Sequence, residues 1–197
     1  NDGSAEENQS GVTAFSSDGF SLGSHAGSNQ SSTTYVAWQW KANAGTTANN
    51  DDGNLTTVVQ ANQAAGFSIV LWTSTGSSDT IGHGLGATPT VIIEKSRSAT
   101  GDWTFFTSVG GRKLLFLNNT NTVTTSFSGV SNVGSSIFTD GNGGTDTRVA
   151  YCFTPIQGYS KFGIYTGNGN ANGTFVHLGF KPAWFMCKSL DTADSDQ

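Results

Sequence analysis

The sequence predicts an all-β fold of tandem β-sandwich-like modules, each built of short antiparallel strands, with a repeat of about 93 residues. Aromatic residues make up 11% of the chain, a density that implies buried surface. Thr, Val and Phe, which strands prefer, are plentiful, whereas there are only three Glu, six Lys and one Met. The 26 Gly lie between short apolar stretches, as turns between strands would. The third observation is that the chain repeats itself.

Charge and hydropathy exclude two classes of partner. Charged residues make up 12% of the 197 residues, and the net charge is −5. There is no basic patch, so we expect no nucleic-acid binding. No run of 18 apolar residues occurs, so we expect no membrane insertion. Residues 1–10 lack the apolar core of a signal peptide.

Two stretches about ninety residues apart share their turn residues and strand-forming residues. "GFSIVLWTSTG…GLGATPTVIIEKS" is matched by "GYSKFGIYTGNG…HLGFKPAWFMCKS". The anchors of the repeat are Gly66, Trp72, Leu85, Gly86, Pro89 and Lys95 in the first copy and Gly158, Tyr165, Leu178, Gly179, Pro182 and Lys188 in the second. In each copy the glycine permits a positive φ, and the proline fits the first residue of a strand. These residues are interpreted as structural.

A second match precedes each copy and divides the chain. "YVAWQW" at residues 35–40 resembles "RVAYCF" at 148–153. We therefore expect residues 1–65 to hold the C-terminal part of one unit plus a polar loop from Ala42 to Ala65. Residues 66–157 would form a complete unit, and 158–197 the N-terminal part of the next. Because the chain stops inside a repeat, we expect the natural polypeptide to continue.

The apolar stretches between turn residues predict ten strands. They are Thr34–Lys41, Ser68–Thr73, Thr90–Lys95, Trp103–Thr107, Lys113–Leu117, Thr122–Phe127, Ser136–Thr139, Thr147–Phe153, Lys161–Thr166 and Ala183–Lys188. The last looks apolar on both faces, as a strand between two layers would be. A helix is conceivable only around Val58–Ala65.

The acidic residues do not form a recognisable catalytic pair. Glycoside hydrolysis needs two carboxylates across a cleft. Apart from Glu6 and Glu7, the chain has one glutamate, Glu94, which we expect on a solvated or ion-paired strand face. Asp79 and Asp102 are expected to shape turns. A depolymerase with a site shared between subunits is left open.

For the other motifs, too, an ordinary structural role explains the residues better than a metal or phosphate site does. His83 and His177 precede the two Leu-Gly pairs without further metal ligands nearby, so we expect turn histidines, and we expect His25 to be exposed. Residues 140–146, "DGNGGTD", resemble the start of a calcium loop, but position twelve is Tyr151 instead of glutamate, which favours a hairpin turn. "GHGLG" at 82–86 lacks the lysine and helix of a phosphate loop. We expect no metal and no cofactor.

The two cysteines fall at places where the other copy has no sulfur. Cys152 aligns with Gln39, and Cys187 aligns with Glu94. We expect two separate thiols, with a disulfide as the alternative.

Taken together, these motifs resemble a repeated module of marine bacteriophage proteins described as tail-fibre-like or virion structural proteins, often found next to a lectin-like sandwich domain. "YVAWQWKANAG" and "GYSKFGIYTGNGNANGTFVHLGFKPAWFMCKS" carry the resemblance, which extends from about Phe15 onward. Glu94 and Cys187 depart from the aliphatic residue usual in the module. The module offers no catalytic residue to carry over.

The resemblance implies a non-enzymatic bacteriophage virion protein, a fibre or appendage module that serves as spacer and host adhesin. Its expected location is the virion, and its expected partners are further copies of itself, as a homotrimer, other virion proteins and host-surface glycans. Trp103 and Tyr159 could stack on sugars, although packing in the core explains them equally well. The alternatives are a capsid decoration protein, a secreted carbohydrate-binding adhesin and a polysaccharide depolymerase.

Overall fold

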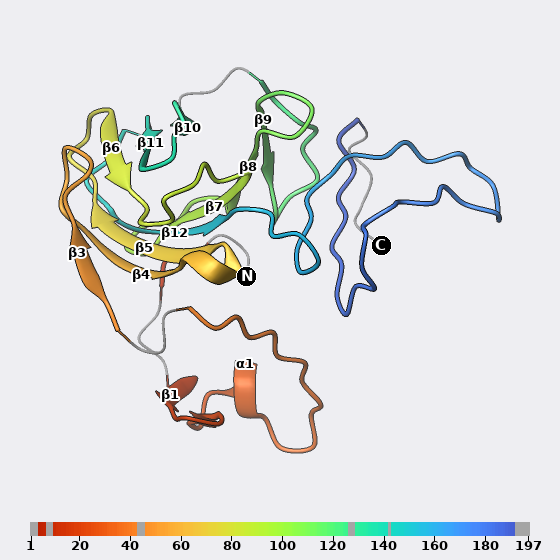
Figure 1. Cartoon of the computed structure of the whole chain (residues 1–197). Coiled ribbons are helices and arrows are strands. Elements are labelled where there is room, and N and C mark those ends of the chain that lie inside the picture. The colour runs from red at the N-terminus through yellow and green to blue at the C-terminus, as the bar shows by residue number, and fades with distance from the viewer. Residues whose placement is uncertain (1–3, 7–9, 43–45, 126–128, 142, 192–197) are drawn as a thin grey trace. The chain divides into compact units, whose positions relative to one another are not determined.

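The computed structural model describes residues 4–6, 10–42, 46–125, 129–141 and 143–191 (Figure 1). It contains two compact units, Glu6–Lys41 and a larger one formed by Asn1–Ala5 with Ala42–Gln197. Strands in antiparallel sheets dominate, and the helical residues described are a four-residue turn and a three-residue 3-10 helix. The all-β prediction is therefore confirmed.

The smaller unit is built around one hairpin. Strand β1 (Val12–Phe15) pairs antiparallel with β2 (Phe20–Leu22), and the single turn α1 (Ala26–Asn29) follows. The strand predicted at Thr34–Lys41 is wrong for this structure, because these residues form exposed coil. A strand needs a neighbour to satisfy its backbone groups, and no strand pairs with this segment among the described residues.

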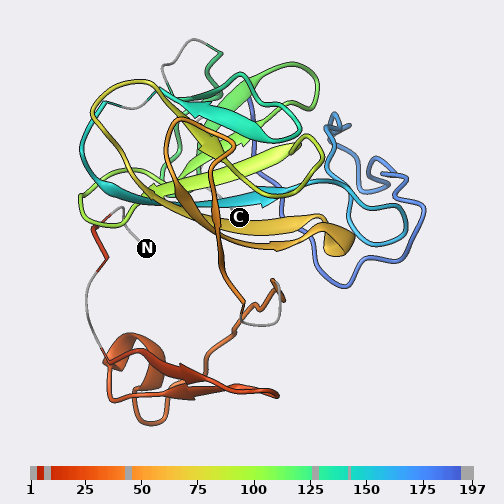
Figure 2. The same ribbon diagram turned by 60° about the vertical axis from the view of Figure 1, so that its left-hand side comes forward.

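The larger unit contains two sheets. Its strands are β3 (Ala48–Asn50), β4 (Thr57–Asn62), β5 (Phe67–Thr73), β6 (Asp79–Gly82), β7 (Val91–Ser96), β8 (Thr104–Thr107), β9 (Lys113–Phe116), β10 (Val130–Ser131), β11 (Ile137–Asp140) and β12 (Thr147–Phe153). The large sheet has the order β3-β4-β5-β12-β7-β8-β9, and the small one β10-β11-β6. In both views the small sheet lies over one face of the large sheet (Figures 1 and 2). Strand β12 occupies the centre, antiparallel to β5 on one side and β7 on the other.

The core fills the space between these sheets. Every second residue of the central strands points inward, as the strand period of two requires. Val70, Ile92 and Ala150 of the large sheet are fully buried, and so is Phe138 of the small sheet. The edge of the Trp72 ring meets Phe138 at 5.9 Å between centroids. The sheets therefore form a sandwich-like core.

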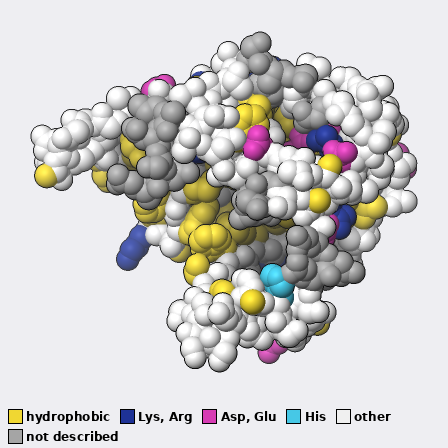
Figure 3. Space-filling model, turned by 180° about the vertical axis from the view of Figure 1, so that it is seen from behind, with side chains coloured by type: hydrophobic (Ala, Val, Ile, Leu, Met, Phe, Trp, Pro, Cys, Tyr) yellow, Lys and Arg dark blue, Asp and Glu magenta, His cyan; other side chains and the backbone are white. Residues whose placement is uncertain are grey.

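The other face of the large sheet is also apolar but only partly covered. Ile69, Ile93 and Tyr151 point there and are half-buried. The Phe153 ring contacts Phe67 at 4.9 Å, and Trp103 stacks on Tyr151 at 6.5 Å. Elsewhere, too, hydrophobic side chains reach the surface in groups (Figure 3). The large sheet thus has one face in the sandwich core and one left partly open.

Most of the strands predicted between residues 66 and 157 are present in the structure, whereas β6 and β10 were not predicted. The strands expected around β5, β7, β8, β9, β11 and β12 are confirmed, and β12 has the predicted bounds. The strand expected at Thr122–Phe127 is reduced to a bridge between Thr124 and Leu114, and Phe127 lies outside the described residues. The polar loop predicted at Ala42–Ala65 is wrong: β3 and β4 extend the large sheet there. A helix around Val58–Ala65 is likewise wrong, except for a 3-10 turn at Gln63–Ala65.

The C-terminal segment, residues 158–191, has no strand among its described residues (Figure 1). The strands predicted at Lys161–Thr166 and Ala183–Lys188 are therefore wrong for the single chain. Several contacts join the segment to the rest of the larger unit: Lys188 Nζ donates to the Asn119 carbonyl at 2.9 Å, the Val123 N–H donates to the Leu190 carbonyl, and the Phe162 ring lies 6.0 Å from that of Phe153. The segment nevertheless leaves most of its apolar side chains at the surface.

Glycines at matching places have the same backbone conformation in the two copies. The pairs are Gly66 (φ 63°) with Gly158 (φ 78°), Gly76 (φ 85°) with Gly169 (φ 64°), and Gly86 (φ 68°) with Gly179 (φ 84°). All lie in the left-handed region, which L side chains avoid. The φ values of these three glycine pairs are therefore similar even where the strands of the two copies differ.

Candidate functional site

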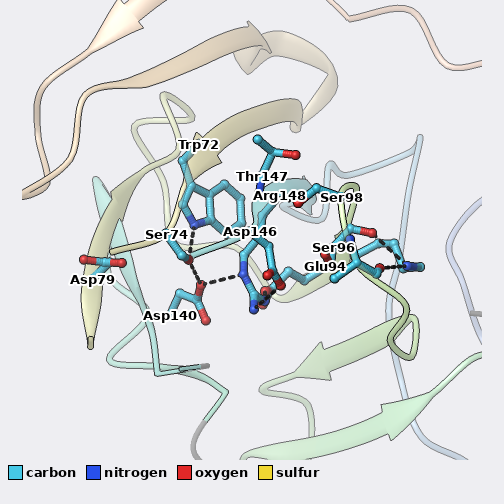
Figure 4. Close-up of polar contacts among 12 residues, drawn as sticks. Trp72, Ser74, Asp79, Glu94, Ser96, Ser98, Asp140, Asp146, Thr147 and Arg148 are labelled. Carbon is cyan, nitrogen blue, oxygen red and sulfur yellow. Dashed lines mark hydrogen bonds and ion pairs between the residues drawn. The ribbon is translucent and has the colours of Figure 1, made fainter. Parts of the chain in front are cut away.

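The densest group of charged side chains surrounds Arg148 at the centre of the large sheet (Figure 4). Arg148 lies on β12, and Glu94 comes from the neighbouring strand β7, on the same face by the period of two. Asp140 ends β11, and Asp146 immediately precedes β12. The site thus draws on both sheets.

Arg148 makes ion pairs with three carboxylates. Its Nη1 donates to Glu94 Oε1, its Nη2 donates to Asp146 Oδ2 at 3.3 Å, and its Nε lies 3.6 Å from Asp140 Oδ2. The Asp140 carboxylate also accepts a hydrogen bond from the Ser74 hydroxyl, which in turn accepts one from the indole of Trp72. The side chains of Glu94 and Asp140 are 1% and 0% exposed, against 25% for Asp146.

Burial alone would lower the pKa of Arg148, but the carboxylates of Glu94, Asp140 and Asp146 outweigh it and raise that pKa. The guanidinium thus keeps its charge and compensates carboxylates that would otherwise be costly to bury. General acid–base chemistry needs a carboxyl within reach of substrate, whereas these are enclosed or engaged. The arrangement joins β7, β11 and β12 electrostatically and is a structural centre.

This geometry settles two sequence predictions. Glu94 was predicted to lie on a solvated or an ion-paired strand face. It is ion-paired with Arg148, and it is buried. The calcium-loop resemblance at 140–146 is explained differently, because the carboxylates at both ends, Asp140 and Asp146, point to Arg148. Asn142, in the middle of that loop, lies outside the described residues.

His83 and His177 occupy nearly matching places in the sequence, shortly before the two Leu-Gly pairs, but different environments. His83 is fully buried; its Nδ1 accepts from the Leu85 N–H, so its Nε2 donates to the Gly134 carbonyl at 3.2 Å. Burial lowers its pKa, although the Gly134 hydrogen bond works in the opposite direction. The prediction of a hydrogen-bonded turn histidine is confirmed for His83. The His177 side chain is exposed, and His25 is half-buried rather than exposed.

Asp79 holds a turn, as predicted. It accepts hydrogen bonds from the backbone and the hydroxyl of Thr75 at 2.9 and 2.7 Å, so its carboxylate serves local backbone geometry. Asp102 instead accepts from the amide of Asn118, 16 residues away, at 2.8 Å. Its contact joins two segments, and its predicted turn role stays a prediction.

The two cysteines are separate thiols, which contradicts the disulfide alternative. Cys152 is completely buried in the core, and this burial raises its pKa to about 12. Cys187 is exposed, and its thiol lies within hydrogen-bonding reach of the Tyr165 hydroxyl, a contact that raises the pKa of Tyr165. The core thiol should be inert and the other accessible.

The two aromatic residues considered for sugar stacking differ. The Trp103 ring is occupied by its stack on Tyr151, which supports a packing role. Tyr159 is 60% exposed and free to meet a ligand. A shallow hollow of about 250 Å³ lies elsewhere, between residues 46–50, the side chains of Val59 and Ala61, and Gly84. Its volume is below that of typical ligand pockets.

The sequence analysis missed the role of Arg148. A signal was available, because Arg148 and Glu94 are charged residues on the inward faces of otherwise apolar strands. Charges at such positions are rarely buried without a partner, so each predicts the other.

The fold and this centre define a class: an all-β, two-sheet domain with a compensated charge cluster in its interior. The chain belongs to a family described as a domain of unknown function, DUF7483, whose profile matches residues 1–196. Neither the curated proteins nor the solved structures contain a match.

The described residues contain no group of three or more His, Cys, Asp or Glu side chains placed to hold a metal ion. None of their helices has the length and apolar character needed to cross a membrane.

Proposed function

We propose that this protein is a structural module of a bacteriophage virion, a repeated β unit of a fibre or appendage that serves as a spacer. The observation that carries the proposal is the internal repeat of about 93 residues. Matching glycines adopt the same left-handed conformation in both copies, which supports a common turn framework. Repeat architectures of this kind suit extended assemblies, because each unit can bury its apolar surface only against a neighbour.

The apolar outer face of the large sheet supports a role in assembly. Its half-buried residues, such as Ile69, Ile93 and Tyr151, form a surface of the kind that stacked units cover. Assembly as a homotrimer, together with other virion proteins, is part of the proposal and follows the resemblance. The three carboxylates nearest one another are engaged by Arg148, which favours a structural over a hydrolytic role.

Adhesion to host-surface glycans is the second part of the proposal. Tyr159 supports it, because its ring is exposed and apolar rings stack on sugar faces. A capsid decoration protein and a secreted carbohydrate-binding adhesin share this chemistry and differ in location. A depolymerase would require carboxylates free of Arg148.

Immunogold electron microscopy of phage particles whose genome encodes the chain tests the structural proposal. Antibody raised against the purified chain should label a tail fibre or appendage at copy numbers in multiples of three. Label over the capsid surface would support the decoration alternative, and particles without label would overturn the proposal.

A glycan array tests the adhesive part separately. Wild-type chain should bind particular glycans, and Tyr159→Ala should lose that binding. Phe15→Ala, which alters another exposed aromatic residue, is the control expected to bind as wild type. An array without any binding would remove adhesion while leaving the spacer role intact.

A further inference from the structure

Large apolar side chains are exposed mainly in two segments that the sequence relates to the complete unit. One is the coil at residues 35–40, where Val36 is 74% and Trp38 is 64% exposed. The other is the C-terminal segment, where Phe185 is 78% exposed. Soluble proteins rarely leave such groups uncovered unless another surface binds them.

The complete unit shows what each segment corresponds to. Residues 35–40 match β12, which lies between β5 and β7 and pairs with both over its length. Residues 161–166 match β5, and residues 183–188 match β7. Residues 35–40 thus have the sequence of a central strand without its neighbours. The C-terminal segment has the sequence of the two neighbours without the central strand.

Two paired charged residues of the complete unit both have uncharged counterparts in the matching segments. In the complete unit Arg148 of β12 donates to Glu94 of β7, and both are buried. The residue that matches Arg148 is Tyr35, and the residue that matches Glu94 is Cys187. Burying one charge without the other would be strongly destabilising, because the remaining charge would have no partner. Because both are replaced by uncharged groups, the two segments remain compatible with each other.

We propose that residues 35–40 of one copy of this chain insert, as a β strand, between residues 161–166 and 183–188 of a second copy. The inserted strand would satisfy the backbone groups of both neighbours and cover the exposed aromatic residues of all three segments. This inference rests on the repeat interpretation in the proposed function and specifies the surface through which copies join.

The order of the segments favours a second copy as the donor. In the complete unit the two neighbouring strands precede the central strand along the chain, whereas residues 35–40 precede residues 161–188. Joining the C-terminal segment of one copy to residues 35–40 of another restores the order of the complete unit. Within residues 1–197 each copy carries one donor and one acceptor, so the contact between copies is head-to-tail and generates a closed ring or an open filament.

The register of the complete unit predicts which residues face each other. Ala150 of β12 pairs with Glu94 of β7. Transferred to the matching positions, Ala37 of one copy lies opposite Cys187 of the next. Directly opposed residues in antiparallel strands have Cα atoms about 4.5–5.5 Å apart, within the range of a disulfide.

The test is the variant Ala37→Cys, oxidised in a glutathione buffer. We expect covalent dimers and higher multimers on non-reducing gels, at least about tenfold above wild type, with residues 37 and 187 joined in the cross-linked peptide. Val36→Cys is the matched control, because its side chain points to the other face and should cross-link no more than wild type. Adding Cys187→Ser to Ala37→Cys should abolish the product. Cys152 is buried and should not react.

Two outcomes would overturn the proposal. One is a yield of multimers no higher than in Val36→Cys. The other is a 37–187 disulfide found within monomers, which would place the strand in its own chain. The cross-link reports only on purified chain, so its failure would leave the virion location open, and unlabelled particles would leave the cross-link standing.

A second measurement needs no cysteine. Light scattering after size exclusion should show the wild-type chain associating as its concentration rises. Trp38→Ser should raise the apparent dissociation constant at least about tenfold, because central aromatic residues dominate interfaces. Trp38 lies outside the sandwich core, so circular dichroism of the variant should match wild type. Equal association of the two proteins would contradict the proposal.

Discussion

Residues 66–96 and residues 158–189 share a sequence framework yet differ in structure. Their matching glycines adopt the same left-handed turns. Trp72 of the first is 5% exposed within a strand, whereas the matching Tyr165 is 53% exposed within coil. Turn conformation depends on the local residue, while a strand depends on what pairs with it. The strands of the first region pair with β12, β4 and β8, whereas no strand pairs with the second region among the described residues.

The largest expected effect comes from removing the charge that holds β12 between its neighbours. Arg148→Met leaves Glu94 and Asp140 buried without compensation, so we expect the free energy of unfolding to fall by about 3–5 kcal/mol. Urea denaturation followed by tryptophan fluorescence measures it. Lys181→Met, which removes an exposed charge from the C-terminal segment, should change stability by less than about 0.5 kcal/mol.

A paired substitution sharpens the same comparison. Arg148→Tyr introduces the residue found at the matching place in residues 35–40, and Glu94→Cys introduces that of the C-terminal segment. The double variant should be more stable than Arg148→Tyr alone by about 1–3 kcal/mol, because it no longer buries an unpaired glutamate. A double variant less stable than Arg148→Tyr would contradict the claim that replacing both charges together avoids a buried unpaired charge.

The next effect compares two glycines with the same φ. A Cβ added to Gly66 would lie 2.3 Å from the Thr154 carbonyl oxygen, whereas one added to Gly158 would meet open space. Gly66→Ala should therefore cost about 2–4 kcal/mol, from left-handed strain plus the clash. Gly158→Ala should cost about 1 kcal/mol or less, because its surroundings can relax. Thermal unfolding of both variants measures the difference, and equal losses would contradict it.

The fold could be predicted where short-range patterns and long-range pairing agree. The stretch at Thr147–Phe153 is apolar, bounded by turn residues and flanked by two partners, so its pattern predicts its bounds. Residues 35–40 have the same pattern and are coil, because a strand pattern does not supply a partner. The prediction for β4, "TVVQAN", was wrong for the opposite reason. Its polar residues suggest a loop, but pairing with β5 makes it a strand.

The candidate site could be predicted only in parts. The turn roles of Asp79 and His83 follow in part from local sequence, because Thr75 lies four residues before Asp79 and Leu85 two residues after His83. The second partner of His83, Gly134, lies 51 positions away and could not be predicted. The Arg148 cluster joins residues up to 54 positions apart in sequence, and it forms only when two sheets close on each other. The residue types indicate that a buried charge needs a partner but not which carboxylate provides it.

The smallest effect compares His83 with His177 and concerns pH. In the unfolded chain a histidine binds its proton with a pKa of about 6.5, whereas burial lowers the pKa of His83 in the folded chain. Below pH 6.5 the unfolded state therefore binds more protons. The contribution of His83 to the free energy of unfolding is greatest above this pH and is lost as the pH falls. The slope from this one group is at most about 1.4 kcal/mol per pH unit.

Urea denaturation at pH 7.5, 6.5 and 5.5 should show a steeper loss for wild type than for His83→Gln. His177→Gln, which replaces an exposed histidine, is the control for the substitution itself. A His83→Gln slope as steep as wild type would mean that His83 takes up its proton without leaving the core.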